Sequence, residues 1–369
     1  MANYLSRKEE REISKYNQKV TKELEERKRR KNILESEYLA TMKNPMNVIE
    51  IEDLHTYFFT DVGTVKAVNG VSFSIPQNCT VGVVGESGCG KSVTALSIMQ
   101  LVQAPQGQIV KGAIRYSNGE KCFDIGKMPT EAMRQLRGKE ISMIFQEPMT
   151  SLNPVFTVGF QLDEVTRLHF PEASVNEATK KSIEMLNLVG MADASGVYHK
   201  YPHELSGGMR QRAMIAMALI CNPRLIIADE PTTALDVTIQ AQILDLLSKV
   251  REKIQGSIML ITHDLGVVAE MADYVVVMYA GRIIEIGTAQ DIFLSPKHPY
   301  TVGLLKSKPK MNQQVDRLYC IPGQVPNPID MPNYCYFYDR CCLHKKDCKL
   351  TYPTMKKISA THSVACELV

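Results

Sequence analysis

Short runs of β-branched and aliphatic residues alternate with segments of helical period along the middle of the chain. The runs are VIEIEDL (48–54), TVGVVG (80–85), ISMIFQ (141–146), RLIIADE (224–230), SIMLITH (257–263) and YVVVMYAG (274–281). Several are apolar throughout, which is typical of strands buried on both faces. Helical periods occupy residues 91–103, 176–189, 207–221 and 238–254. This alternation predicts an α/β body with a parallel sheet over residues 46–300.

The segment before this body has a different pattern. Residues 1–45 carry a narrow apolar stripe of Ile13, Tyr16, Val20 and Leu24. Glutamates precede arginines by four residues, the favourable order on a helix, at Glu23–Arg27, Glu25–Arg29 and Glu26–Arg30. The pattern predicts one charged helix, which is either a solvated extension or a docking helix for a partner or an anionic membrane surface.

Composition narrows the function classes. The 369 residues carry a net charge of +3, too small to indicate a nucleic-acid binder, and 44% are hydrophobic, enough for a packed core. No run approaches the ~20 apolar residues of a membrane span. The first residues lack the apolar stretch of a secretory signal, so we expect a cytoplasmic protein whose ten cysteines form no structural disulfides. Residues 301–369 are rich in Pro, Cys and Lys, which predicts a small third region.

A phosphate-binding loop is the strongest chemical signal. The octapeptide after the run at 80–84 fits G-x-x-x-x-G-K-[ST] and consists of Gly85, Glu86, Ser87, Gly88, Cys89, Gly90, Lys91 and Ser92. It lies between a predicted strand and a predicted helix, the context that this motif requires. Glycines let backbone N–H groups surround phosphates, and the helix N-terminus adds positive potential. Lys91 then reaches the β- and γ-phosphates, and Ser92 can ligate Mg²⁺.

Two further motifs suit nucleotide chemistry. The strand at 225–228 ends in Asp229, suited to holding Mg²⁺, and Glu230, suited to polarising a water as general base. Ser206 is followed by Gly207 and Gly208 at the start of a predicted helix, which makes a second phosphate-binding N-terminus. A single nucleotide site does not need two phosphate-binding helix N-termini. The second helix N-terminus therefore implies either a second ATP or a second face of an ATP held by another chain.

Six motifs in one order resemble the ATP-binding subunits of ABC transporters, over about residues 47–300: the phosphate-binding loop, Gln146, LSGGMRQ (205–211), IIADE (226–230), ALD (234–236) and His263. The resemblance implies a P-loop NTPase fold of the ABC nucleotide-binding type, with a RecA-like core and a helical subdomain at about 148–205. It implies that Gln146 senses the γ-phosphate and joins Ser92 and Asp229 around Mg²⁺. Glu230 would be the catalytic base and His263 the switch histidine on the γ-phosphate.

The same resemblance implies contacts across a dimer. The residues that would close over the ATP of the opposite subunit are Ser206, Gly207, Gly208 and Gln211. Asp236 would contact the other protomer, and Phe58, chosen by spacing from three adjacent aromatics, would stack on adenine. Cys89 replaces the serine that is more usual in this family, and we expect its thiol to make the loop sensitive to oxidation.

Three strings identify a branch of the family: QEPMTSLNP (146–154), HPYT (298–301) and IPGQVPNP (321–328). They resemble the oligopeptide, dipeptide and nickel importers, most closely the OppD/DppD type, and extend the resemblance to about residue 366. The resemblance implies a second ATP-binding subunit (OppF/DppF-like), two membrane permease subunits and an extracytoplasmic peptide-binding protein. It places the chain at the cytoplasmic face of the membrane, with ATP and Mg²⁺ and no nucleic acid.

Six of the ten cysteines lie in the last 50 residues. Cys335, Cys341, Cys348 and Cys366 lack the close C-x₂₋₄-C pair of zinc knuckles and the bacterial ferredoxin run. The C-terminal region of similar subunits is associated with a [4Fe-4S] cluster, so the resemblance implies that these four thiolates ligate one. Zinc and free thiols are the alternatives.

These expectations combine into one mechanism: two ATPs close a dimer, hydrolysis through Glu230 reopens it, and separate membrane subunits import a peptide. Import of nickel or another small solute is the alternative within transport. A soluble ABC ATPase acting on DNA or ribosomes is the remote alternative. Lys91 and Ser206 are only 115 residues apart, too close for the coiled-coil insertion of chromosome-type ATPases, and the chain holds one cassette rather than two.

Overall fold

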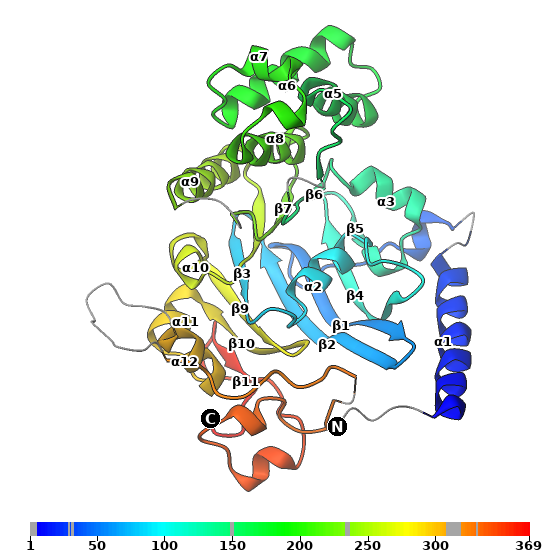
Figure 1. Cartoon of the computed structure of the whole chain (residues 1–369), viewed down its shortest axis with the longest axis vertical. Helices are drawn as coiled ribbons and strands as arrows, with labels where there is room; N and C mark the ends of the chain where they lie inside the picture. Colours follow the sequence, from blue (N-terminus) through cyan, green and yellow to red (C-terminus); the bar gives the residue numbers. More distant parts are fainter. Residues whose placement is uncertain are drawn as a thin grey trace.

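The computed structural model describes residues 6–28, 30, 33–147, 151–232, 237–307, 319–329 and 331–369. Two sheets form the centre of the molecule, with a helical layer beyond one end of the larger sheet and the C-terminal region beyond the other (Figure 1). The first helix lies along the outer side of the smaller sheet (Figure 1). Within the described ranges, no helix combines the length and the hydrophobicity needed to cross a bilayer.

The larger sheet has eight strands in the order β11-β12-β10-β9-β3-β8-β7-β6. Its parallel part consists of β9 (Tyr274–Tyr279), β3 (Thr80–Val84), β8 (Ser257–Ile261), β7 (Leu225–Asp229) and β6 (Ile141–Ile144). Every residue of β3, β6, β7 and β8 is buried, as their apolar runs predict. The antiparallel edge adds β10 (Arg282–Thr288), β12 (Ser363–Val364) and β11 (Lys356–Lys357).

The smaller sheet is antiparallel, in the order β2-β1-β4-β5. It consists of β1 (Asn47–Thr60), β2 (Gly63–Pro76), β4 (Gly107–Ser117) and β5 (Cys122–Asp124). The run VIEIEDL lies in β1, so its assignment to the parallel sheet is wrong. Its strand turns back directly into β2, with Thr60 paired to Gly63, and this short connection allows only antiparallel pairing.

The predicted helices of the body are present, some with different ends. They are α2 (Lys91–Ile98), α6 (Val175–Leu188), α8 (Gly207–Leu219) and α9 (Val237–Ile254). The helix predicted over 91–103 ends five residues early, because Gln100 adopts a left-handed backbone at φ 50°. The body also contains, among the described residues, α3 (Thr130–Leu136), α5 (Val158–His169), α7 (Ala194–His199), α10 (Leu265–Met271), α11 (Ala289–Leu294) and α12 (Pro299–Lys306).

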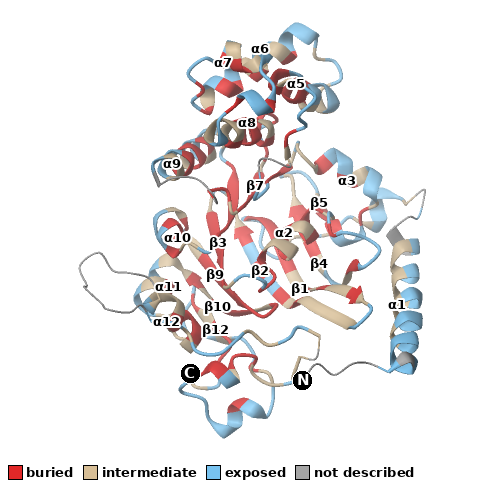
Figure 2. Cartoon of the chain, in the orientation of Figure 1, coloured by how far each residue is buried: buried red, intermediate tan, exposed pale blue. Residues whose placement is uncertain are grey.

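Buried residues, red in Figure 2, lie in the sheets and on the helix faces that cover them. In the described part of the chain they include three hydrophobic clusters that hold these layers together. Alternate residues of β7 divide between two of them: Leu225 and Ile227 face the smaller sheet and α2, whereas Ile226 and Ala228 face the helical layer. This period of two is the expected consequence of a strand covered on both sides. The third cluster joins β9 to α12 and to aromatic residues of the C-terminal region.

The C-terminal region is built onto the large sheet. Short 3₁₀ turns, η4 (Tyr338–Arg340) and η5 (Lys346–Lys349), precede β11 and β12. The Glu285 carboxylate in β10 is buried and accepts from the backbone N–H groups of Lys297 (2.6 Å) and His298 (3.0 Å). It also contacts the buried His362 imidazole at 2.8 Å. Because a buried carboxylate must be hydrogen-bonded, this node fixes the C-terminal strands against β10.

The N-terminal extension contains a shorter helix than the one predicted over 1–45. Helix α1 covers Arg7–Lys28, and a later turn, η1, covers Glu35–Glu37. Leu39 then forms a β-bridge with Phe123, and the Ala40 N–H donates to the Cys122 carbonyl at 2.9 Å. These bonds to β5 need an extended backbone, which is incompatible with a continuous helix.

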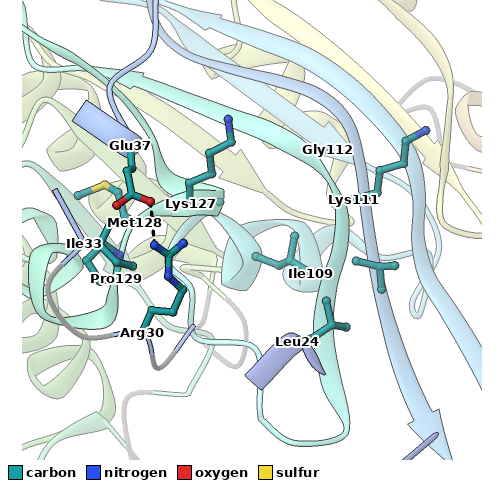
Figure 3. Close-up of a pocket in the computed structure, with 12 residues that line it drawn as sticks. Leu24, Arg30, Ile33, Glu37, Ile109, Lys111, Gly112, Lys127, Met128 and Pro129 are labelled. Carbon is teal, nitrogen blue, oxygen red and sulfur yellow. Dashed lines mark hydrogen bonds and ion pairs between the residues drawn. The ribbon is translucent and has the colours of Figure 1, made fainter. Parts of the chain in front are cut away.

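A groove lies between this extension, β4 and the turn η2 (Ile125–Lys127) (Figure 3). Leu24 of α1 and Ile109 of β4 line its apolar part. The predicted pair of Glu26 and Arg30 is wrong: the Arg30 guanidinium contacts the Glu37 carboxylate instead, at 3.0 Å (Figure 3). None of the nucleotide-binding residues predicted from the sequence lines this groove.

Candidate nucleotide-binding and hydrolysis site

The phosphate-binding loop connects the carboxyl end of β3 to α2, which packs against strands of both sheets. Gly85 and Gly90 have positive φ angles of 154° and 99°. A Cβ atom would lie 2.2 Å from the Met278 carbonyl oxygen at Gly85 and 2.3 Å from the Ala67 carbonyl oxygen at Gly90. Only glycine fits at these two positions, because the loop is pressed between backbone of β9 and β2.

The Lys91 amine is held inside the same loop. Its Nζ donates to the Gly85 carbonyl oxygen at 2.8 Å and to the Glu86 carbonyl oxygen at 3.1 Å, and the side chain is 5% exposed. Lys91 also begins α2, where the free backbone N–H groups favour an anion. A buried ammonium and a helix N-terminus therefore converge on one small space that suits phosphate.

A hydroxyl and a carboxylate form the second part of the site. The Ser92 hydroxyl donates to Asp229 Oδ1 at 3.0 Å, across 137 positions of the chain. Burial raises the pKa of Asp229 above its usual value. A divalent cation beside this carboxylate would favour its ionised form, so the pair has the oxygen chemistry of a magnesium site.

Glu230, at the end of β7, lies between two other predicted residues. Its carboxylate accepts from Gln146 Nε2 at 3.2 Å through Oε2, and its Oε1 lies 3.4 Å from His263 Nδ1. Its backbone N–H donates to the Ile261 carbonyl at 2.8 Å, and its φ of 47° turns the chain sharply after the strand. The ends of β6, β7 and β8 thus bring together three residues that are dispersed in the sequence.

The signature residues lie at the start of α8. Ser206 caps this helix, its hydroxyl accepting from the Met209 N–H at 3.3 Å, and a Cβ at Gly207 would meet nothing within 4 Å. Gly208 follows on the next position, with only Ile239 near a Cβ built there. This exposed helix N-terminus presents backbone N–H groups outward.

Gln211 differs from its prediction. Its amide is buried and donates to the Pro231 carbonyl at 2.5 Å, so it faces inward rather than toward an opposite nucleotide. The prediction grouped Gln211 with Ser206, Gly207 and Gly208 because all four belong to one continuous motif, LSGGMRQ (205–211). However, Gln211 lies inside α8 rather than at its exposed start, and its amide packs against the segment after Glu230.

Two predicted contacts, that of Phe58 with adenine and that of Asp236 with the other protomer, stay predictions. Phe58 lies half-buried in β1, opposite Val65 of β2 and Gly107 of β4. A Cβ at Gly107 would lie 2.9 Å from the Phe58 ring, so this glycine makes room for the aromatic side chain. Asp236 lies outside the described residues.

The side chain of Glu86 makes a contact that its motif does not predict. Arg340 of the C-terminal region binds both carboxylate oxygens of Glu86, at 2.7 and 3.0 Å. The Tyr300 hydroxyl accepts from the Glu86 N–H at 2.8 Å. Because the partners are 214 and 254 positions away, no local pattern could have identified them.

The four cysteines predicted as ligands gather in the C-terminal region. Cys335, Cys341, Cys348 and Cys366 all line one small apolar cavity, whereas Cys320 and Cys342 are exposed and do not. Burial raises the pKa of Cys335 to about 11 and also raises the pKa of Cys341 and Cys366. In the described part of the chain, no three His, Cys, Asp or Glu side chains lie close enough together to bind a single metal ion.

Cys89 does not have the environment of a reactive thiol. It is 1% exposed, and burial raises its pKa, although its Sγ lies 3.8 Å from Lys91 Nζ. The expectation that it makes the loop sensitive to oxidation is therefore wrong, because the thiolate is the reactive species and burial disfavours it.

Comparisons with known proteins identify the family of the chain. The family described as ABC transporter matches residues 68–233, and the oligopeptide/dipeptide transporter C-terminal region matches residues 284–348. The oligopeptide transport ATP-binding protein AppD of Bacillus subtilis (strain 168) is 48% identical over 321 residues, covering 87% of this chain and 96% of AppD. The dipeptide transport ATP-binding protein DppD of the same organism is 49% identical over 321 residues, covering 87% and 94%.

Solved structures share the fold. A dimeric bacterial ABC transporter cassette superposes with a TM-score of 0.58 at 25% identity, covering 65% of this chain and 98% of the cassette. The protein cbiO1 from Clostridium perfringens, part of the ABC transporter complex cbiONQ, gives a TM-score of 0.57 at 24% identity, covering 70% and 95%.

The buried state of Cys89 can be tested by labelling. We expect a water-soluble maleimide to modify Cys342 in the native protein within minutes and Cys89 only after denaturation, because only an exposed thiolate reacts. Peptide mass spectrometry after quenching measures both sites in one sample, with Cys342 as the internal control. Equal labelling rates at the two positions would contradict the buried geometry.

Proposed function

This chain belongs to the ATP-binding subunits of ABC transporters, in the oligopeptide/dipeptide branch, and we propose that it hydrolyses ATP to power peptide import through separate membrane permease subunits. The observation that carries the proposal is the position of the Glu230 carboxylate. It lies between Gln146 and His263, in sequence directly after the Asp229 that contacts Ser92 of the phosphate-binding loop.

Hydrolysis follows from what these side chains can do. When ATP enters, Lys91 exchanges the carbonyl oxygens of Gly85 and Glu86 for phosphate oxygens. Ser92 and Asp229 fit Mg²⁺, which when bound neutralises charge on the phosphates.

Glu230 accepts a proton from the attacking water, as a carboxylate within hydrogen-bond reach can. His263, which is 66% exposed, is free to turn from Glu230 toward the γ-phosphate.

The signature motif needs a second subunit. Ser206 and Gly207 present their helix N-terminus to solvent, and such a site binds the phosphates of an ATP held by another protomer. The partner is a second ABC ATP-binding subunit of OppF/DppF type, with a homodimer as the alternative. Asp236 and Phe58 contact the partner and the adenine ring, respectively.

An exposed aromatic surface on the helical subdomain is the docking site for the permease subunits. Phe156 and Phe160 stack at 4.7 Å and are 42% and 49% exposed, and Val155 beside them is 69% exposed. Contiguous exposed apolar side chains of this kind mark interaction sites. Docking here places the chain at the cytoplasmic face of the membrane, and an extracytoplasmic peptide-binding protein delivers the solute.

The descriptions of the similar proteins favour a peptide as the transported solute. AppD and DppD, at 48% and 49% identity, are described as oligopeptide and dipeptide transport proteins, and the matched C-terminal region carries the same description. Import of nickel or another small solute is the alternative in the same branch. The selective contacts lie on other subunits in either case.

The cysteine cavity supports a second proposal, a [4Fe-4S] cluster. The donor set fits: the four predicted cysteines all line one apolar space, and four thiolates are the usual ligands of such clusters. A cluster also needs a wider spacing of thiolates than a single ion does. Cluster binding would deprotonate Cys335, whose pKa burial otherwise holds at about 11.

The role of Glu230 has a direct kinetic test. In Glu230→Gln we expect kcat for ATP hydrolysis to fall by at least about 100-fold, because the base is lost, while ATP binding is retained and an ATP-bound dimer accumulates. Phosphate release and size-exclusion chromatography measure these effects. Glu252→Gln, an exposed glutamate on α9, is the matched control. Wild-type turnover in Glu230→Gln would remove Glu230 from this role.

The cluster has a spectroscopic test. Protein purified without oxygen should contain roughly four irons per chain and show broad absorption near ~400 nm. We expect Cys335→Ser to lose both signals and Cys342→Ser to keep them, since Cys335 lines the cavity and Cys342 does not. Iron-free anaerobic protein without this absorption would overturn the proposal.

A further inference from the structure

Glu86 is held on three sides, and two of the contacts come from outside the phosphate-binding loop. Its backbone carbonyl accepts from Lys91 Nζ at 3.1 Å, inside the loop. Its N–H donates to the Tyr300 hydroxyl of α12, and its carboxylate accepts two hydrogen bonds from Arg340 of η4. The C-terminal part of the chain therefore binds Glu86, and the backbone carbonyl of Glu86 accepts a hydrogen bond from Lys91.

Arg340 is itself fixed in a single orientation. Its Nε donates to the Pro322 carbonyl at 2.8 Å, and its Nη1 lies 3.3 Å from the Tyr279 hydroxyl. The side chain is 5% exposed, and the ring of Phe337 lies beneath the guanidinium at 5.8 Å. A planar guanidinium held in this way offers its remaining N–H groups as a rigid fork, which matches a carboxylate bidentately.

Tyr300 is equally rigid. Its side chain is fully buried, and its ring packs against Tyr279 at 4.7 Å and Phe337 at 5.5 Å. The same aromatic group thus supports both contacts to Glu86. Cys341, which lines the cysteine cavity, directly follows Arg340, so this cavity and the phosphate-binding loop share one short segment.

We infer that Arg340 is a positioning residue for ATP binding, which orients Glu86 and neutralises its charge beside the triphosphate. This inference rests on the proposed ATPase function and adds a residue outside its motifs. Without Arg340, the Glu86 carboxylate is a fixed negative charge next to the loop that must accept phosphates. The Glu86 side chain also loses the two hydrogen bonds that fix it, and with them part of the restraint on the residue whose carbonyl accepts from Lys91.

Removing the charge of Glu86 should rescue the ATP binding of an Arg340 variant. Arg340→Gln leaves Glu86 unpaired, so repulsion should weaken ATP binding. Adding Glu86→Gln removes that charge and restores an amide-to-amide contact. The double variant should therefore bind ATP better than Arg340→Gln alone. If the loss comes only from the missing hydrogen bonds of Arg340, removal of the Glu86 charge should not restore the affinity for ATP.

Kinetics of the purified full chain test the inference. We expect Arg340→Gln to raise KM for ATP and the Kd for a fluorescent ATP analogue by about tenfold, with kcat within about twofold because Glu230 and His263 are untouched. Arg340→Lys should fall between, since a lysine cannot form the bidentate pair. Glu86→Gln with Arg340→Gln should recover most of the lost affinity.

Arg282→Gln is the matched control. Arg282 also stacks on an aromatic ring of the C-terminal region, Tyr352 at 4.0 Å, but Glu86 is not among its contacts. We expect Arg282→Gln to leave KM for ATP unchanged. Melting curves of all variants show whether each is folded.

Two outcomes separate the inference from the function on which it rests. Unchanged KM in a folded Arg340→Gln protein, or loss of affinity in the double variant equal to that in the single one, overturns the positioning role and leaves the ATPase intact. A wild-type chain that hydrolyses no ATP, either alone or together with the second ATP-binding subunit, overturns the proposed function itself.

Discussion

The amine of Lys91 is the charge around which the nucleotide site is arranged, and the chain can hold it only in a loop made largely of backbone. Gly85 and Gly90 let that loop pass against the carbonyl oxygens of Met278 and Ala67, where any side chain would collide. The loop is therefore clamped between the two sheets before any phosphate arrives. Such preorganisation keeps the binding groups in place without a further ordering cost.

The parallel sheet then determines which side chains can reach this loop. Strands β3, β6, β7 and β8 run in the same direction, so the residues after them meet at one edge. Ser92 contacts Asp229 there, and Glu230 contacts Gln146 and His263. In the proposed function, the exposed start of α8 is the complementary half, which binds a nucleotide that a second subunit supplies. Closure of the two subunits and reopening after hydrolysis would then be the motion that drives the membrane subunits.

Much of this site can be predicted from the sequence because its motifs are local. An apolar run followed by Asp229 and Glu230 identifies both a buried strand and the residues at its end. The same reasoning fails where a contact joins distant segments: the pair of Glu86 and Arg340 spans 254 positions. It also fails where burial decides chemistry, as for the thiol of Cys89, because no sequence pattern reports how deeply a loop residue is covered. Residues 48–54 can be predicted as a strand from their sequence alone. Which of the two sheets this strand joins depends on the tight turn after Thr60.

The central claim is that ATP hydrolysis by this chain drives peptide uptake. It is tested most directly in cells that lack the chain's gene and express either the wild-type protein or Glu230→Gln. Uptake of a labelled dipeptide, a labelled hexapeptide and nickel is measured side by side, after redundant importers have been removed. The account predicts that peptide uptake returns with the wild-type chain and not with the variant, while nickel uptake is the same in both. Peptide uptake that does not depend on Glu230, or loss of nickel uptake alone, would contradict it.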